Sequence, residues 1–168
     1  IVNGVAAAMA VGEMARDEVK KFVSDRARVG LDIRFTADRP VLGNWDRTRL
    51  SQVISCLLTN AAIYGQGRPI EISVTAYRGR ARLKVRDWGM GISKEDQERI
   101  FSPFERGVPS DSFGGIGLGL FIGRQVAEAH QGTLKVESSL KEGSLFVVDL
   151  PRDLPIASAV SRTLAKSA

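Results

Sequence analysis

Four blocks of the sequence hold residues that could together bind ATP. In chain order they are an Asn-bearing segment, LSQVISCLLTNAAIYG (50–65), followed by DWGMGI (87–92), FSPFERG (101–107) and GGIGLGLFI (114–122). An ATP site needs an acceptor for the amine of the base, an oxygen ligand for the metal and free N–H groups for the phosphates. No block is decisive alone, but together they supply all three.

Asp87 is the candidate that would recognise the base. It ends a predicted strand, and Gly89 and Gly91 let the backbone turn sharply and approach a neighbouring group. An ionised carboxylate only accepts hydrogen bonds, so it suits the exocyclic amine of adenine and repels the carbonyl oxygen of guanine. Because Asp-x-Gly also makes ordinary turns, a purely structural role is the alternative.

The glycine block could hold phosphates. GGIGLGLF opens a predicted helix with several glycines, which leaves backbone N–H groups free at a positive helix end. A dinucleotide-binding Rossmann motif would follow a strand, whereas this block follows a loop that contains Pro and Ser. We therefore expect residues 107–115 (GVPSDSFGG) to form a flexible lid whose C-terminal end becomes a helix.

Asn60 is the candidate metal ligand. On a predicted helix over 46–64, Cys56, Asn60, Ile63 and Tyr64 share one face. The amide oxygen of Asn60 is a hard ligand that could complete the coordination of Mg²⁺ already held by a triphosphate. The alternative is an Asn that only forms a local hydrogen bond. Tyr64 could stack on a base, or could simply be an aromatic residue at the edge of the core.

His130 is the only histidine of the chain. It lies at the end of the last predicted long helix, just before Gly132, where a His favours the negative end of the helix or caps it. This position predicts a structural role and not that of a phosphoacceptor.

The composition is that of one soluble globular domain. Of the 168 residues, 43% are apolar and 26% are charged, and the net charge of +5 comes from scattered Lys and Arg. No platform of aromatic and basic residues is present, so nucleic acid is not an expected partner. The single cysteine excludes an internal disulfide and a Cys-based metal cage, which favours a reducing compartment such as the cytoplasm.

The N-terminal residues carry no evident membrane signal. Residues 1–11 are small and apolar, but they lack a basic lead and are shorter than the ~20 residues of a membrane span. We expect no membrane contact by this domain. Since the chain begins without Met, residues 1–12 are expected to be a linker or a remnant of a longer protein.

Hydrophobic periodicity predicts the elements that would position these residues. Helices are predicted over 13–29, over 46–64 and from 119 to 132, and strands over 31–36, 70–77, 80–86, 133–138 and 144–150. The strands at 70–77 and 80–86 read as a β-hairpin. The predicted fold is α/β, a two-layer sandwich of a mixed, largely antiparallel sheet with three helices on one face. The domain would span 13–151, and 152–168 would be a flexible tail.

Taken together, the blocks resemble the catalytic and ATP-binding domain of sensor histidine kinases. That family belongs to a larger group that also holds gyrase B, the Hsp90 chaperones and MutL. WDRTRLSQVISCLLTNAAIYG is similar to the Asn box of the family, DWGMGI to its first glycine box, IFSPFERG to its Phe box and GGIGLGLFIGRQVAEAHQG to its second glycine box. The match runs from about Val41 to Pro151 and implies a Bergerat fold.

The resemblance also implies roles for single residues. Asp87 would read adenine, Tyr64 would line the base pocket, and Asn60 would coordinate Mg²⁺. Ser144 would help to hold adenine through water, Phe101 and Phe104 would seat the lid, and Arg106 would approach the phosphates, which the backbone of the second glycine box would contact. The implied ligands are ATP and Mg²⁺, and the full nucleotide-binding set is Asn60, Tyr64, Asp87, Gly89, Gly91, Ile92, Phe104, Arg106, Gly115, Gly117, Leu118, Gly119 and Ser144.

Two positions depart from the family pattern. Cys56 stands where the family often has Asn or an acid, and Ile63 stands where it often has Lys. Without a second protein ligand beside the metal and without the positive charge of a Lys near the phosphates, Mg²⁺ binding or phosphoryl transfer would be weaker. Without an acid at position 56, the gyrase type of hydrolysis lacks its general base.

These features lead to one hypothesis and two alternatives. The chain would present Mg-ATP for γ-phosphoryl transfer to a His on a separate dimerisation domain, absent from this chain, of a cytoplasmic or membrane-anchored kinase. A response regulator would act downstream, and the chain alone would bind nucleotide and phosphorylate nothing. One alternative is a degenerate nucleotide-binding regulatory module without phosphotransfer. The other is an anti-sigma-type Ser/Thr kinase, which shares the boxes.

Overall fold

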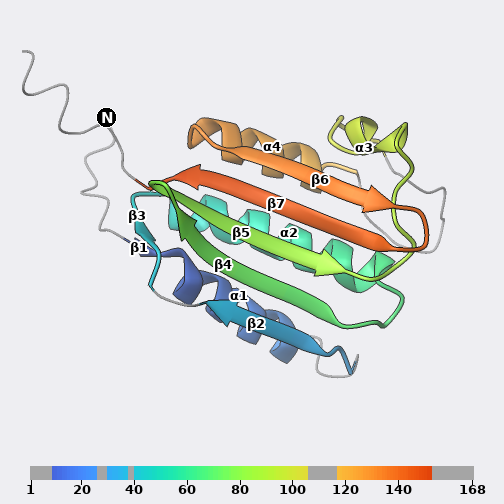
Figure 1. Ribbon diagram of the computed structural model, residues 1–168, viewed down its shortest axis with the longest axis horizontal. Coiled ribbons are helices and arrows are strands. Elements are labelled where there is room, and N and C mark those ends of the chain that lie inside the picture. Colours follow the sequence, from blue (N-terminus) through green and yellow to red (C-terminus); the bar gives the residue numbers. More distant parts are fainter. Residues whose placement is uncertain (1–8, 26–29, 38–39, 106–116, 153–168) are drawn as a thin grey trace, which may run out of the picture.

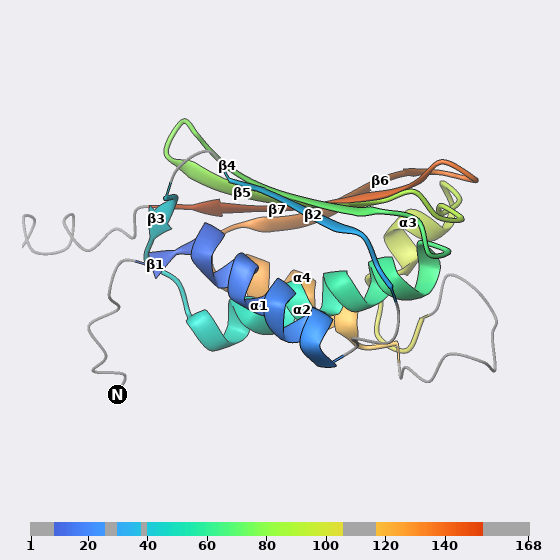
Figure 2. The same cartoon turned by 90° about the horizontal axis from the view of Figure 1, so that it is seen from below.

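A sheet covered on one face by three long helices forms the framework of the protein. The structure, a computed structural model, describes residues 9–25, 30–37, 40–105 and 117–152. Its elements are β1 (Met9–Ala10), α1 (Val11–Asp25), β2 (Ile33–Ala37), β3 (Leu42–Gly43), α2 (Arg47–Tyr64), β4 (Ile70–Tyr77), β5 (Arg80–Asp87), α3 (Asp96–Arg99), α4 (Gly119–Ala129), β6 (Thr133–Ser139) and β7 (Gly143–Pro151). Figure 1 looks onto the sheet, and Figure 2 shows α1, α2 and α4 below it.

The main sheet is mixed and largely antiparallel. Its strand order in the described part of the chain is β2-β4-β5-β7-β6, and only the β2–β4 pair is parallel. A parallel pair needs a long crossover, which α2 provides between β2 and β4. With the helices on one face, the predicted two-layer α/β sandwich is confirmed (Figure 2).

The predicted hairpin is confirmed at β4 and β5. Tyr77 pairs with Arg80, so the turn contains only Arg78 and Gly79. Both have positive φ, at 47° and 75°. Positive φ at both central residues is the requirement of a type I′ turn, whose twist matches that of the two antiparallel strands it joins.

Three short elements were not expected from the sequence. β1 pairs with β3 in a separate two-stranded sheet, and α3 is a single helical turn. Each is shorter than the stretch in which a hydrophobic period becomes visible. The helix predicted over 13–29 begins two residues earlier, at Val11, whose N–H donates to the carbonyl of Val41 (3.0 Å). Residues 26–29 of that prediction lie outside the described part of the chain.

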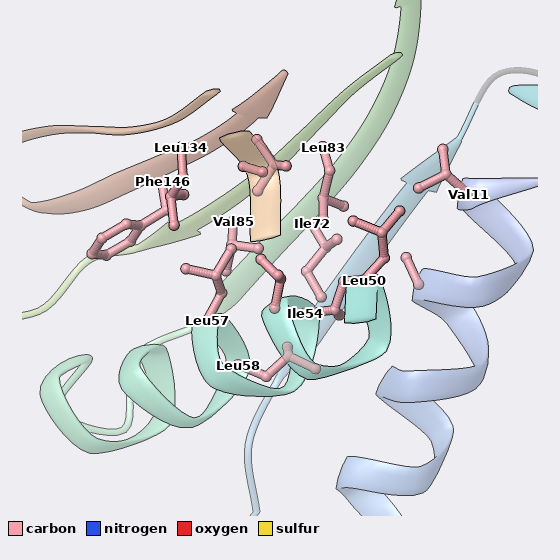
Figure 3. Packing of buried hydrophobic residues seen from close by; sticks show 14 of the residues in the cluster. Val11, Leu50, Ile54, Leu57, Leu58, Ile72, Leu83, Val85, Leu134 and Phe146 are labelled. Atoms are coloured by element: carbon pink, nitrogen blue, oxygen red, sulfur yellow. The ribbon is translucent and has the colours of Figure 1, made fainter. Parts of the chain in front are cut away.

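The core fills the space between the sheet and the helices. Alternate residues of β5 are buried on its helix-facing side, and α2 buries one stripe against them, which consists of Leu50, Val53, Ile54, Leu57, Leu58 and Ala61. Figure 3 shows Leu57 and Ile54 of α2 near side chains of the sheet such as Val85 and Ile72. Burial of each large aliphatic side chain contributes ~1.5–3 kcal/mol, so this stripe fixes α2 firmly beneath the strands. Among the described residues, no helix is both long and apolar enough to span a membrane.

The start of α2 is fixed by His130 at the end of α4. The side chain of Asp46 caps α2 by accepting from the N–H of Arg49 (3.0 Å), and the N–H of Asp46 donates to Nε2 of His130 (2.9 Å). Nδ1 of the same ring lies 2.8 Å from the carbonyl oxygen of Val126, which can only accept. Both ring nitrogens are therefore engaged, which confirms the predicted structural role of His130.

We expect His130→Ala to lower the free energy of unfolding by about 1–3 kcal/mol, since it removes both contacts and leaves the N–H of Asp46 unpaired. Chemical denaturation checks this, with Gln125→Ala on the exposed face of α4 as the control. A His130→Ala protein as stable as the control would show that the bridge between the helices contributes nothing.

Candidate nucleotide site

A cavity of about 890 Å³ lies at the end of the sheet where β5 stops. Its walls come from the C-terminal half of α2, the loop after β5, the start of α4, the turn between β6 and β7, and the first residues of β7. The volume lies within the range of small-molecule sites, ~300–1,000 Å³. All four predicted blocks contribute described residues to its walls, and the Phe-containing block adds Ile100 and Glu105.

Asp87 is a buried acceptor in this wall. It ends β5 on the helix-facing side of the sheet and is 3% exposed. One carboxylate oxygen accepts from the N–H of Gly89 at 2.9 Å. Burial raises the pKa of Asp87, although hydrogen bonds from the N–H groups of Gly89 and Ser144 and the charge of Arg86 oppose the rise. A donor that enters the cavity would compensate part of the cost of burying this carboxylate.

The glycines after Asp87 are required by close backbone packing. A Cβ atom on Gly89 would lie 1.9 Å from the carbonyl oxygen of Tyr64, and one on Gly91 would lie 1.9 Å from that of Ser139. The same loop is tied to both neighbours, because Met90 donates from its N–H to Tyr64 (3.2 Å) and accepts from the N–H of Lys141 (2.7 Å). The loop is thus wedged between the end of α2 and the β6–β7 turn, which fixes the position of Asp87.

The start of α4 forms the other end of the cavity. Gly117 has φ of +74° and lines the wall with Leu118 and Gly119, and α4 begins at Gly119. The first N–H groups of a helix have no acceptor within the helix, so they remain available to an anion. The carbonyl of Gly117 accepts from the N–H of Phe104 at 3.0 Å, which joins this turn to the Phe-containing block.

Asn60 lies between these two ends, on α2. Its amide nitrogen is 3.9 Å from Sγ of Cys56, a weak contact, and none of the described residues donates to its amide oxygen. Cys56 packs under the glycine turn, since a Cβ atom on Gly119 would lie 2.7 Å from its sulfur. Burial raises the pKa of Cys56 to about 11, so the thiol is neutral near pH 7.

Most of the predicted nucleotide-binding residues share this cavity. Those that line it are Asn60, Tyr64, Asp87, Gly91, Ile92, Gly117, Leu118, Gly119 and Ser144. Gly89 supports the wall from behind. Phe101 is buried against the guanidinium of Arg124, whereas Phe104 is 71% exposed. Arg106, Gly115 and the predicted lid at 107–115 lie outside the described part of the chain.

The β6–β7 turn is a part of the site that the sequence did not reveal. Leu140 and Lys141 line the cavity opposite α2. In the sequence, the only indication that Leu140 and Lys141 belong to the site is that they precede Ser144. The strand register places Ser144 directly beside Asp87. Because strand order cannot be deduced from periodicity, the sequence could not place this turn next to the loop after Asp87.

Carboxylates predominate among the charged residues of the described wall. The charged lining residues there are Asp87, Asp96, Glu105 and Lys141, so carboxylates outnumber the single cation. Asp96 and Glu105 each pair with Arg99, at 3.1 and 3.0 Å. The described residues include no cluster of three or more His, Cys, Asp or Glu that could hold a metal.

Sensor histidine kinases are among the known proteins that this chain resembles. The model of the family described as histidine kinase-, DNA gyrase B-, and HSP90-like ATPase matches residues 45–154. The chain is 40% identical over 127 residues to the sensor-like histidine kinase SenX3 of Mycobacterium tuberculosis, covering 71% of this chain and 30% of that protein. It is 32% identical over 146 residues to the sensor histidine kinase RppB of Synechocystis, covering 84% and 32%.

Solved structures lead to the same family. The catalytic domain of the histidine kinase ThkA has a TM-score of 0.76 and 28% identity, with 87% of this chain and 97% of that domain covered. The chain spans about a third of the length of the two sequence relatives. It belongs to the family of histidine kinase-, DNA gyrase B- and HSP90-like ATPases, as a domain with the fold of histidine kinase catalytic domains, which confirms the resemblance drawn from the sequence.

Proposed function

We propose that this chain presents Mg-ATP for transfer of the γ-phosphoryl group to a His on a separate dimerisation domain. The arrangement of the cavity carries the proposal. It has a buried acceptor, Asp87, at one end and the free N–H groups of a helix start, at Gly119, at the other. Such a cavity suits a molecule with an amine-bearing base and a chain of phosphates.

Transfer to a protein group is favoured over hydrolysis. In transfer, the bond between the γ-phosphorus and the bridging oxygen breaks, ADP leaves, and a nitrogen of the acceptor His bonds to phosphorus and loses its proton. Positioning and charge neutralisation supply most of the catalysis of such a step. Hydrolysis would need a base to take a proton from water, and the neutral thiol of Cys56 does not serve as one.

Bound Mg²⁺ would neutralise charge on the phosphates. We assign Asn60 as its protein ligand, because its amide oxygen is a hard metal ligand and no described residue donates a hydrogen bond to it. Ile63, also in the wall, contributes no charge. The remaining ligands would come from the triphosphate and water.

The same two residues support a second candidate function. A neutral Cys56 and an apolar Ile63 leave the α2 wall without the ion-pairing groups that assist transfer. A module of this kind would bind nucleotide and regulate a partner without transferring phosphate.

In the leading proposal the domain acts within a larger kinase. The phosphorylated His of the dimerisation domain would pass the group to a response regulator. The reaction would take place in the cytoplasm, where ATP is available.

The proposal predicts phosphoryl transfer only when this chain and the His-bearing domain are both present. We expect this chain, mixed with the His-bearing domain of its parent protein and radiolabelled Mg-ATP, to label that domain, and the chain alone to remain unlabelled. Substituting the acceptor His by Gln controls for the site of labelling. ATP binding without any labelling would favour the regulatory module instead, and label on Ser or Thr of an added protein would point to the Ser/Thr kinase class.

We expect Asp87→Asn to weaken ATP binding by about 10- to 100-fold, because it replaces an acceptor in the wall by a group that also donates. Titration calorimetry measures this, and Glu137→Gln, an exposed carboxylate on β6, is the control. Affinity in the native protein should also fall as the pH falls through the raised pKa of Asp87, since protonation turns one carboxylate oxygen from an acceptor into a donor and removes the negative charge. An Asp87→Asn protein with native affinity would rule out this role.

Ionisation of Asp87 also affects stability. Because its pKa is raised in the folded state, the unliganded protein bears a cost for the charged form above that pKa. The cost declines as the pH falls from the raised pKa toward the ordinary pKa of an Asp carboxyl, and it vanishes below that ordinary value.

We expect Asn60→Ala to abolish the gain in ATP affinity that Mg²⁺ provides, because the metal would lose its protein ligand. Affinity without metal should change little. Calorimetry with and without Mg²⁺ measures the difference, and Gln52→Ala, exposed on the same helix, is the control. If Mg²⁺ strengthens binding equally in both variants, the metal does not use Asn60.

A further inference from the structure

The hydroxyl of Ser138 lies behind the base-recognition end of the cavity and makes three contacts. It accepts from the N–H of Ile92 at 2.8 Å, lies 2.7 Å from the carbonyl oxygen of Gly143, and lies 3.1 Å from the hydroxyl of Ser144. Ser138 is on β6, Ile92 is in the loop after Asp87, and Ser144 is on β7. One side chain thus joins three segments that surround the site.

These three contacts determine the directions of the hydroxyl protons of Ser138 and Ser144. The N–H of Ile92 can only donate and the carbonyl of Gly143 can only accept, so the single proton of Ser138 points to Gly143. The remaining contact is a hydrogen bond only if Ser144 donates to Ser138. The proton of Ser144 is thereby directed away from the cavity, and its oxygen keeps only lone pairs for a ligand.

Ser144 lies beside Asp87 in the wall. The two residues are register partners on β7 and β5, they are 4% and 3% exposed, and both line the cavity. With the proton of Ser144 directed to Ser138, this part of the wall offers two neighbouring acceptors and no side-chain proton. A base that presents an amine here finds partners, whereas a base that presents a carbonyl oxygen meets two acceptors.

We propose that Ser138 is a positioning residue for base selection, which holds Ser144 as an acceptor and so excludes purines that carry a carbonyl in place of the amine. This inference rests on the proposed function, in which the ligand is ATP. Ser138 does not line the cavity itself and acts through Ser144.

Ser138 also has a structural role that the test must separate. The N–H of Ile92 donates to the Ser138 hydroxyl, and the amide nitrogen of Gln97 donates to the backbone carbonyls of Ile92 (3.2 Å) and Ser138 (2.9 Å), so both sets of contacts hold the loop to β6. Loss of the Ser138 hydroxyl would remove the first of these contacts, loosen the loop and lower affinity for every nucleotide. Only a role through Ser144 would change the preference between two bases.

The experiment compares ATP with inosine triphosphate, which has a carbonyl in place of the amine and a proton on the adjacent ring nitrogen. We expect the native chain to prefer ATP, and Ser138→Ala to reduce the ratio of the two affinities about fivefold to tenfold, because a freed Ser144 hydroxyl can rotate and donate to the carbonyl. Ser138→Thr keeps the hydroxyl and should keep the native ratio. In a Ser144→Ala background, Ser138→Ala should not change the ratio further.

The possible results distinguish a failure of the proposed function from a failure of the proposed role of Ser138. If the native chain binds neither nucleotide, the proposed function fails. If it prefers ATP, and Ser138→Ala lowers both affinities equally, the function stands and Ser138 only supports the loop. Circular dichroism checks folding. Should Ser138→Ala not fold, Ser138→Cys keeps the volume but accepts weakly, and an unchanged ratio in that variant would overturn the proposal.

Discussion

Close backbone packing around the end of β5 is the constraint on which the site depends. A Cβ atom on Gly143 would lie 2.1 Å from the carbonyl oxygen of Asp87, and one on Gly89 would lie 1.9 Å from that of Tyr64. Glycines distant in sequence thus let α2, β5 and the β6–β7 turn meet without side chains between them. Because these backbones touch, the carboxylate of Asp87 is buried, oriented and hydrogen-bonded before any ligand enters.

In the proposed function, base recognition and phosphate binding would rely on different interactions. The base end has two side-chain acceptors, Asp87 and Ser144. Their directions are set by the pairing of β5 with β7 and by the contact between the hydroxyls of Ser138 and Ser144. The phosphate end offers backbone N–H groups at the start of α4, beside the uncharged Cys56 and Ile63. Selectivity would therefore come from the protein itself, whereas affinity for the phosphates would depend strongly on the metal that accompanies them.

Local patterns predicted much of the fold and of the site. The residues Arg78 and Gly79 specify a tight hairpin, and the apolar stripe of α2 specifies which of its faces is buried. The Asn and glycine blocks predicted most of the wall of the cavity. These features depend on neighbours in sequence, where propensity and periodicity act directly.

The remaining features depend on contacts between distant segments. The order β5-β7-β6 places Lys141 at the cavity, and no periodicity encodes strand order. The partner of His130 lies 84 residues away, and the contacts of Ser138 join three segments. The roles of Arg106 and Gly115 stay predictions, because these residues lie outside the described part of the chain.

The position of β7 has a consequence for how the domain is made. In the described part of the chain β7 is the last strand in sequence, yet it lies inside the sheet between β5 and β6 (Figure 1). During synthesis β6 and β7 can pair through their short turn, but β5 would lack its second neighbour until β7 had left the ribosome. Such late, long-range pairing is slow and leaves apolar surface exposed. Since Ser144 also arrives with β7, the nucleotide could stabilise only the finished domain, as a ligand that acts at the end of folding.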